Sequence, residues 1–289
     1  MGVRQAMAVC PEAVRQAFFR INEPERAQEL RLRLGQTAAV TTDRGEIALT
    51  GVRVNGELLS AVLANATGQA VYAAQDMLRA GFLTLPGGHR LGICGRGIYK
   101  DGGLWTVKEI SSVNLRFARA VTGCANQAAD HLWQHPASTL IVGPPCAGKT
   151  TLLRDLIRQM SDRFGWRVCV ADERLELAAC LDGMPQFDLG RRTDVLSGIR
   201  KAEAIEMLLR TMNPQWIAVD EITAVEDAQA LLRGSYCGVR FLATAHAYSP
   251  SELRQRPLYR QLTESGLFEN LVTIRSDRTV HTERWRQID

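Results

Sequence analysis

The sequence predicts an α/β protein of two parts, an N-terminal α+β domain over residues 1–122 and a second domain over 123–289 with a mainly parallel sheet. Its 289 residues are about twice the length of a typical domain of roughly 100 to 200 residues. Hydrophobic residues make up 46% and charged residues 23%, so the chain can bury a core. After His135-Pro136, short strands and glycine-rich turns give way to strands that alternate with helices.

The first part combines helical and strand patterns. Leu30, Leu32 and Leu34 alternate with arginines, the two-residue period of a half-buried strand. Glycines between short apolar pieces over 82–99 favour a hairpin rather than a helix. In chain order we expect a helix at 11–19, strands at 30–34, 38–41, 45–49 and 52–54, a helix at 58–80, the hairpin at 82–99, a strand at 113–117 and a linker at 118–124.

The second part alternates short apolar strands with longer helical patterns, which predicts parallel strands joined by crossover helices. Ligands of such sheets bind at the carboxyl ends of the strands, so residues that follow each strand are candidates for a site. We expect helices at 127–134, 152–163, 202–212 and 224–233, and strands at 139–142, 168–171, 216–219 and 239–243.

Composition excludes several classes of protein. The net charge of +4 is too small to argue for a nucleic-acid or anionic membrane partner by itself. Seven scattered cysteines without a Cys-x-x-Cys pair favour a reduced, cytoplasmic compartment. No signal peptide opens the chain, and the longest uncharged stretch, 58–75, is interrupted by polar residues. Any membrane association is therefore expected to be peripheral.

A phosphate-binding loop follows the strand expected at 139–142. Its pattern, Gly-x-x-x-x-Gly-Lys-Thr, lies between a strand and a helix, the context that this motif requires. Lys149 would reach the terminal phosphates and the Thr150 hydroxyl would hold Mg²⁺, while backbone amides surround the phosphates. The expected nucleotide-binding residues are Gly143, Pro144, Pro145, Cys146, Ala147, Gly148, Lys149, Thr150 and Thr151.

Paired carboxylates end the strand expected at 216–219. Asp220 would orient a water bound to Mg²⁺, and Glu221 would polarise the water that attacks ATP. A strand that ends in solvated acidic residues gives the same pattern. The position about 70 residues after a phosphate loop favours the catalytic interpretation.

Two further groups follow strands at the same edge. Asp172-Glu173-Arg174 comes after the strand at 168–171, which makes Glu173 a second candidate for activating water. His246 ends the strand at 239–243 and could sense the γ-phosphate. Solvated charges and a packed histidine are the structural alternatives for these residues.

These segments, in this order, resemble the traffic ATPases of type II and type IV secretion systems. The phosphate loop, Asp172-Glu173-Arg174, Leu209-Arg210 with Asn213-Pro214, Asp220-Glu221 and Thr244-Ala245-His246 correspond to elements of that superfamily. The sequence is more similar still to its stage III sporulation protein AA branch. That branch shares the runs Gly190-Arg191-Arg192-Thr193-Asp194-Val195-Leu196, Lys201-Ala202-Glu203, Gly81-Phe82-Leu83-Thr84 and Gly87-Gly88-His89-Arg90-Leu91-Gly92.

The resemblance implies an ATPase with a RecA-like P-loop NTPase domain, ATP and Mg²⁺ as ligands, and assembly into a homo-oligomer, usually a hexameric ring. It adds Arg210 to the nucleotide contacts. It implies a motor of a secretion or channel complex, here the channel between mother cell and forespore, acting from the cytoplasm at the mother-cell membrane face with membrane-embedded partners. Arginines of the first domain or a neighbouring subunit would complete the site, and the candidates are Arg90, Arg96, Arg116 and Arg119.

Two other functions fit parts of the sequence. A nucleotide-gated adaptor would bind ATP for assembly and hydrolyse little of it. An ATP-dependent binder of single-stranded nucleic acid resembles a related branch, but that branch carries an Arg-x-x-x-His motif that the tail of this chain lacks, so a nucleic-acid partner is not expected. The transported substrate, the ring size and the docking partner are not encoded in any recognisable motif.

Overall fold

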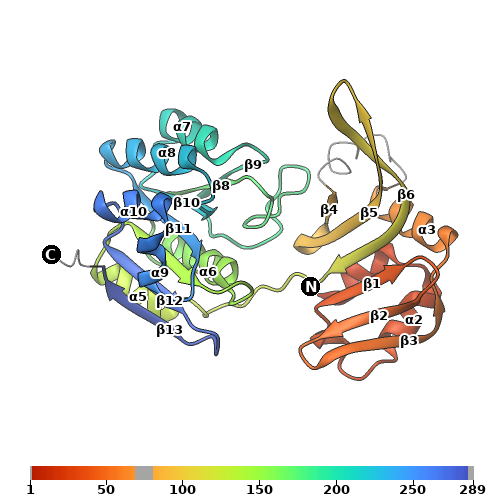
Figure 1. The fold of residues 1–289 in the computed structure, drawn as a ribbon. Coiled ribbons are helices and arrows are strands. Elements are labelled where there is room, and N and C mark those ends of the chain that lie inside the picture. The colour runs from red at the N-terminus through yellow and green to blue at the C-terminus, as the bar shows by residue number, and fades with distance from the viewer. Residues whose placement is uncertain (1, 69–80, 286–289) are drawn as a thin grey trace. The chain divides into compact units, whose positions relative to one another are not determined.

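The computed structural model describes residues 2–68 and 81–285. Their contacts divide the chain into two compact units, Met1–Arg119 and Ala120–Asp289 (Figure 1). We keep the boundary after residue 122 as a prediction, because a division by contacts does not test independent folding.

The first unit is a six-stranded antiparallel sheet in the order β3-β2-β1-β6-β5-β4. In β1, Leu30 and Leu32 are buried while Arg31 and Arg33 lie on the other face, as the alternation predicts. Helices pack over the apolar face through Val14, Phe18 and Leu59. The elements are α1 (Val3–Ala6), α2 (Glu12–Phe19), β1 (Glu29–Arg33), β2 (Thr37–Thr42), β3 (Gly45–Arg53), α3 (Gly56–Ala66), β4 (Phe82–Leu85), β5 (His89–Lys100) and β6 (Gly103–Arg116), with short 3₁₀ turns at Met7–Val9, Pro24–Arg26 and Pro86–Gly88.

Several elements of this unit are longer or shorter than predicted. The strands expected at 45–49 and 52–54 form one strand, β3, which passes through Gly51 at a positive φ of 85°. The helix expected at 58–80 ends at Ala66, and residues 69–80 of that prediction lie outside the described part of the chain. The strand expected at 113–117 is the end of the longer β6.

The second unit is a seven-stranded sheet in the order β13-β12-β7-β11-β10-β8-β9. All neighbouring strands are parallel except β12 and β13, so the expected parallel sheet is present. The elements are α5 (Asn126–Gln134), β7 (Thr139–Gly143), α6 (Lys149–Asp162), β8 (Val168–Asp172), β9 (Thr193–Ser197), α7 (Lys201–Thr211), β10 (Trp216–Glu221), α8 (Val225–Tyr236), β11 (Arg240–His246), α9 (Pro250–Gln255), α10 (Pro257–Glu264), β12 (Asn270–Ile274) and β13 (Val280–Arg284).

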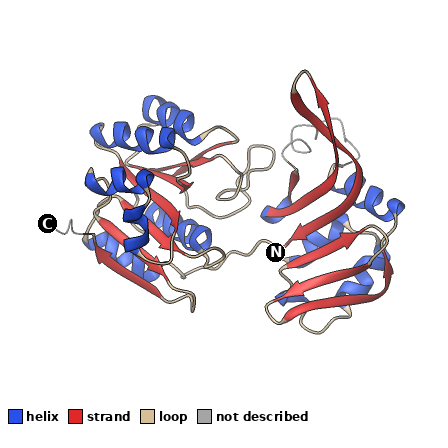
Figure 2. Ribbon diagram, viewed as in Figure 1, coloured by secondary structure: helices blue, strands red, loops and turns tan. Residues whose placement is uncertain are grey.

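Helices cover both faces of this sheet (Figure 2). Ile217 and Val219 face the core shared with α7 and α8, whereas Trp216 and Ala218 face the core shared with α5 and α6. Burial on both faces explains why β7, β8 and β10 are nearly continuous apolar runs in the sequence. The predicted fold class, an N-terminal α+β part followed by a RecA-like α/β part, is confirmed.

Five elements of the second unit were not predicted from the sequence: β9, α9, α10, β12 and β13. β9 and β13 are the two edge strands of the sheet and are only partly buried, so they lack an apolar run. Among residues 2–68 and 81–285, no helix combines the length and the apolar character needed to cross a lipid bilayer.

Candidate active site

The loop between β7 and α6 has the backbone geometry expected of a phosphate loop. Gly143 ends β7, where an added Cβ would lie 2.8 Å from the carbonyl oxygen of Ile274. Gly148 has a φ of 98° and directly precedes α6. Only glycine meets both demands without strain. Cys146, at the exposed turn of the loop, also has a positive φ, 61°.

Lys149 begins α6, and its side chain turns back to the loop. Its ammonium group donates to the carbonyl oxygens of Gly143 at 2.9 Å and Pro144 at 2.8 Å, and it contacts Nδ1 of His246 at 2.5 Å. Burial lowers the pKa of Lys149, and the charges of Glu221 and Asp220 oppose that shift. All three N–H groups of the ammonium are engaged, so a phosphate that binds Lys149 must replace at least one of these partners.

His246 connects Lys149 to Glu221, although Lys149 lies 97 residues away in the sequence. An ammonium group can only donate, so Nδ1 of His246 accepts and the proton of a neutral imidazole is on Nε2. Nε2 lies 3.2 Å from a carboxylate oxygen of Glu221. Lys149, His246 and Glu221 thus form a chain of consecutive contacts in the structure. Each of the three was predicted separately from the sequence.

Asp220 is held by the neighbouring strand. The hydroxyl of Thr244 donates to its carboxylate at 3.2 Å. Burial, followed by the negative charge of Glu176, raises the pKa of Asp220. A cation at this carboxylate would oppose both effects, since a positive charge favours the ionised form.

The residues fit the Mg²⁺ that was expected. Mg²⁺ keeps several waters and is commonly bound by one or two side chains together with substrate phosphates. Thr150, in the first turn of α6, and Asp220, through water, would supply oxygen atoms of this kind. In the described part of the chain, no group of three or more His, Cys, Asp or Glu side chains could hold a metal without such a substrate.

The acidic residues at the end of β8 have different partners. The carboxylate of Asp172 is buried and accepts hydrogen bonds from the backbone N–H groups of 176–179, at 2.8 to 3.3 Å. Glu173 forms an ion pair of 2.8 Å with the buried Lys201. Burial acts to raise the pKa of Glu173, but the hydrogen bond and charge of Lys201 lower it.

One charged residue near the site was not predicted. Arg154 lies on α6, with its guanidinium 3.9 Å from the ring centre of Phe187 and a hydrogen bond of 3.2 Å to the carbonyl oxygen of Glu176. Burial lowers the pKa of Arg154, against the charges of Asp172 and Asp220. The carbonyl oxygen of Thr151, a predicted nucleotide-binding residue, accepts a hydrogen bond of 3.8 Å from the thiol of Cys124. No spacing rule in the sequence marks an arginine of this kind.

The structure does not bring Arg210 to the loop. Its guanidinium donates to the carbonyl oxygen of Glu206 within α7. It lines a surface hollow of about 440 Å³ together with Asn213 and Gln215, which precede β10, and Arg240, which begins β11. The amino ends of the parallel strands lie there, whereas Gly143 and Asp220 lie at their carboxyl ends.

The four arginines expected to complete the site each contact residues of the first unit. Arg90 lies over the ring of Phe82 at 3.6 Å, and Arg96 forms an ion pair with Glu109 at 2.7 Å. Arg116 lies 3.5 Å from Glu29, and Arg119 donates to the carbonyl oxygens of Glu25 and Ala27 at 2.7 and 3.0 Å. Their role at a phosphate remains a prediction.

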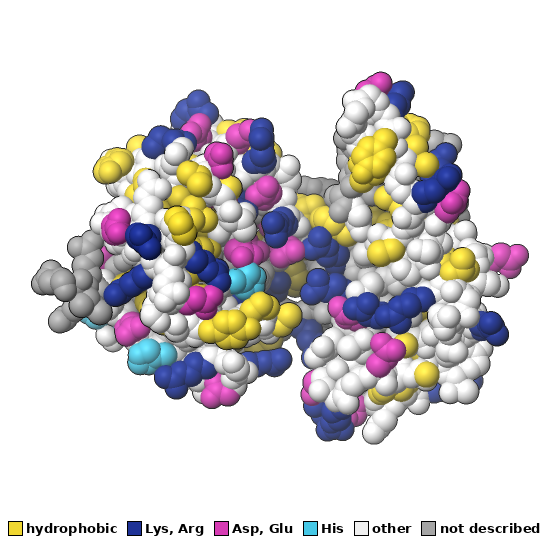
Figure 3. Space-filling view, viewed as in Figure 1, with side chains coloured by type: hydrophobic (Ala, Val, Ile, Leu, Met, Phe, Trp, Pro, Cys, Tyr) yellow, Lys and Arg dark blue, Asp and Glu magenta, His cyan; other side chains and the backbone are white. Residues whose placement is uncertain are grey.

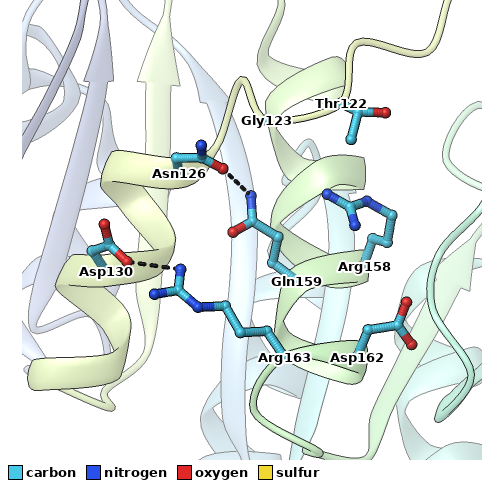
Figure 4. Close-up of a pocket in the computed structure, with 8 residues that line it drawn as sticks. All are labelled: Thr122, Gly123, Asn126, Asp130, Arg158, Gln159, Asp162 and Arg163. Atoms are coloured by element: carbon cyan, nitrogen blue, oxygen red, sulfur yellow. Dashed lines mark hydrogen bonds and ion pairs between the residues drawn. The ribbon is translucent and has the colours of Figure 1, made fainter.

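A second hollow, of about 580 Å³, lies between the start of α5 and the end of α6 (Figure 4). Its polar groups bind one another, Asn126 with Gln159 and Asp130 with Arg163. It lies at the opposite end of α6 from the phosphate loop.

On the face shown in Figure 3, basic, acidic and histidine side chains of the second unit lie next to one another.

Two solved structures have a similar fold. The Legionella pneumophila ATPase DotB matches 94% of this chain and 78% of its own, with a TM-score of 0.61 and 15% sequence identity. The pilus retraction motor PilT, solved with bound ADP, matches 94% of this chain and 81% of its own, with a TM-score of 0.62 and 17% identity. The chain therefore shares the fold of DotB and PilT.

Sequence comparison gives the family. The chain matches the family described as sporulation stage III, protein AA, over residues 4–283. Stage III sporulation protein AA of Bacillus subtilis (strain 168) is 36% identical over 273 residues, which cover 92% of this chain and 89% of that protein. The protein SEEDLING PLASTID DEVELOPMENT 1 of Arabidopsis thaliana is 28% identical over 151 residues, 52% of this chain and 22% of its own. This chain belongs to the stage III sporulation protein AA family, as its motifs indicated.

Proposed function

We propose that this chain binds ATP with Mg²⁺ at the loop Gly143–Thr150 and hydrolyses it to ADP and phosphate. The observation that supports this most is the alignment of Lys149, His246 and Glu221 at the carboxyl edge of a RecA-like sheet. Groups placed in advance around a reacting phosphate are the main source of catalysis in phosphoryl transfer.

Each residue would have a distinct task. Lys149 would move from its own loop carbonyls to the terminal phosphate, and Glu221 would orient the attacking water. Nε2–H of His246 would donate to the Glu221 carboxylate and hold it in place. Since Lys149 contacts the same imidazole, a phosphate bound to Lys149 would be linked through His246 to the residue that orients the water. Thr150 and Asp220 would hold Mg²⁺, which offsets charge on the phosphates.

We further propose that the ATPase is a motor of a secretion or channel complex, the channel between mother cell and forespore. It would act as a homo-oligomer, a hexameric ring, on the cytoplasmic side of the mother-cell membrane with membrane-embedded partners. Family membership supports the link to sporulation, and the RecA-like secretion fold supports assembly and a peripheral position. Arg90, Arg96, Arg116 and Arg119 stay candidates for completing a neighbouring site.

A second candidate function is a nucleotide-gated adaptor with little turnover. The observation that favours it is the engagement of all three N–H groups of Lys149 within the chain. Such a site gives up existing hydrogen bonds when a phosphate enters, so slow turnover without a partner is consistent with it.

One experiment separates these functions. Molar mass in solution and phosphate release are measured on the same sample, with and without Mg-ATP, for the wild type and Lys149→Ala. A motor assembles and releases phosphate, and Lys149→Ala loses the release. An adaptor assembles with ATP and releases almost none. Equal phosphate release from Lys149→Ala would contradict the assigned site.

A further inference from the structure

The strand ends that carry His246 and Glu221 are tied to one short segment of the chain. Arg256 lies at the junction of α9 and α10, and its guanidinium donates to the carbonyl oxygen of His246 at 2.7 Å. Tyr259, in the first turn of α10, donates its hydroxyl to the carbonyl oxygen of Ile222 at 2.7 Å. The two acceptors belong to His246 itself and to the residue after Glu221.

The donors are themselves fixed in place. Tyr259 is buried, which raises its pKa and keeps the hydroxyl as a donor. Arg256 forms an ion pair with Glu252, whose carboxylate also accepts from the backbone N–H of Tyr248 at 2.7 Å. Ser249 caps α9 by accepting from the N–H of Glu252. Side chains of the segment that follows His246 therefore hold the junction of α9 and α10 in place.

Besides the strand pairing of His246 with Gly143 and of Glu221 with Thr244, two long backbone bonds cross the same region. Ala247 donates to the carbonyl oxygen of Gly143 at 3.3 Å, and Ile222 donates to that of Thr244 at 3.3 Å. These distances exceed the usual value of about 2.9 to 3.0 Å for such bonds. The contacts from Arg256 and Tyr259, both 2.7 Å, are shorter than these two bonds, and they join both strand ends to one short segment of the chain.

We infer that Arg256 and Tyr259 are positioning residues for ATP hydrolysis, which fix the His246 and Glu221 strand ends so that imidazole and carboxylate stay in hydrogen-bond contact. The inference rests on the proposed ATPase activity. Its physical reason is the steep dependence of rate on geometry, since a displacement of about 1 Å at a reacting group can cost roughly 10²-fold. Neither residue needs to touch ATP.

The test compares four variants by kcat, KM and the rise in Tm with Mg-ATP. Tyr259→Phe keeps the buried ring and removes only the hydroxyl. Arg256→Gln removes the guanidinium, and Arg256→Lys keeps a charged donor. Arg260→Gln is the matched control, because Arg260 is an exposed arginine of α10 whose guanidinium donates to the carbonyl oxygen of Arg254 at 3.2 Å.

We expect kcat to fall about tenfold or more in Arg256→Gln and roughly three- to tenfold in Tyr259→Phe, through lost geometry rather than lost binding. KM and the Mg-ATP shift in Tm should stay at wild-type values in both. Arg256→Lys should recover part of the loss, and Arg260→Gln should match the wild type.

A double variant gives the sharper result. If Arg256 acts through His246 and Glu221, Arg256→Gln should lower kcat no further when Glu221→Gln is already present, because residues that act as a unit are not additive. Unchanged kcat in both single variants, an equal loss in Arg260→Gln, or an additive loss in the double variant would overturn the inference while leaving the ATPase proposal intact. Absence of phosphate release from the wild type would overturn both.

Discussion

The ends of β8 and β10 show how the same sequence pattern can serve two purposes. Both are buried parallel strands that finish in two acidic residues at one edge of the sheet. At β8, Asp172 binds four backbone N–H groups and Glu173 binds Lys201. At β10, the carboxylates face Thr244 and His246 instead.

The difference lies in what each carboxylate is free to do. A carboxylate that accepts several backbone N–H bonds shapes a loop and has little capacity left for a ligand. A carboxylate beside one hydroxyl or one imidazole can still accept from water or approach a hydrated cation. We therefore propose that the carboxylates at the end of β8 shape a loop and that those at the end of β10 take part in the chemistry.

The largest expected effect is on turnover at β10. Glu221→Gln should lower kcat by roughly 10² to 10⁴, the range for loss of a positioned proton acceptor, because an amide cannot polarise water as a carboxylate does. ATP binding, measured as the rise in Tm with Mg-ATP, should remain, since Lys149 and the loop are unchanged. Glu226→Gln, an exposed change on α8, is the control and should hydrolyse ATP at the wild-type rate.

The next effect is on stability at β8. Asp172→Asn should lower the free energy of unfolding by about 2 to 4 kcal/mol, because the new NH₂ group would face backbone donors and leave some of them unsatisfied. Urea denaturation without nucleotide measures it, with the exposed Asp182→Asn as control. Equal stability of Asp172→Asn and the wild type would refute the architectural role.

A smaller effect of opposite sign is expected at Asp220. Burial, then the charge of Glu176, raises the pKa of Asp220, so the native state binds its proton more readily than the unfolded state. Keeping this carboxylate ionised therefore costs stability above its folded pKa, and the cost disappears as pH falls through that value.

Asp220→Asn should consequently raise the nucleotide-free stability at neutral pH by roughly 0.5 to 2 kcal/mol, as removal of a functional-site strain often does. The gain should shrink in acid, and stabilisation by Mg-ATP should weaken. Unfolding titrations at several pH values with and without Mg-ATP measure both. A variant less stable than the wild type at neutral pH would contradict the assigned burial cost.

Local patterns explain which parts of the fold and site could be predicted. The phosphate loop is contiguous, and its glycines and Lys149 meet geometric demands within a few residues. The contacts of Lys201 with Glu173 and of Thr244 with Asp220 span 28 and 24 residues and depend on the order of strands in the sheet. No spacing in one sequence encodes that order.

Arg210 is a predicted nucleotide contact that the structure places at the other edge of the sheet. It was expected to contact the nucleotide because the segment Leu209-Arg210 resembles an element of the secretion ATPases. A crossover helix returns to the start of the next parallel strand, so the end of α7 lies beside Asn213 and Gln215 at the amino edge of the sheet. The resemblance therefore points to the segment, whereas the direction of the intervening helix decides at which edge of the sheet its arginine lies.

The most direct test of the contrast between β8 and β10 is single-turnover hydrolysis, with protein in excess over Mg-ATP, in Glu221→Gln and Glu173→Gln. This measurement isolates the chemical step from product release. We predict that Glu173→Gln keeps a rate within roughly threefold of the wild type, with a small stability loss of about 1 kcal/mol from the buried Lys201. Glu221→Gln should leave ATP bound and unhydrolysed over the same time. Near-normal hydrolysis in Glu221→Gln together with a stalled Glu173→Gln would contradict the account and move the catalytic carboxylate to β8.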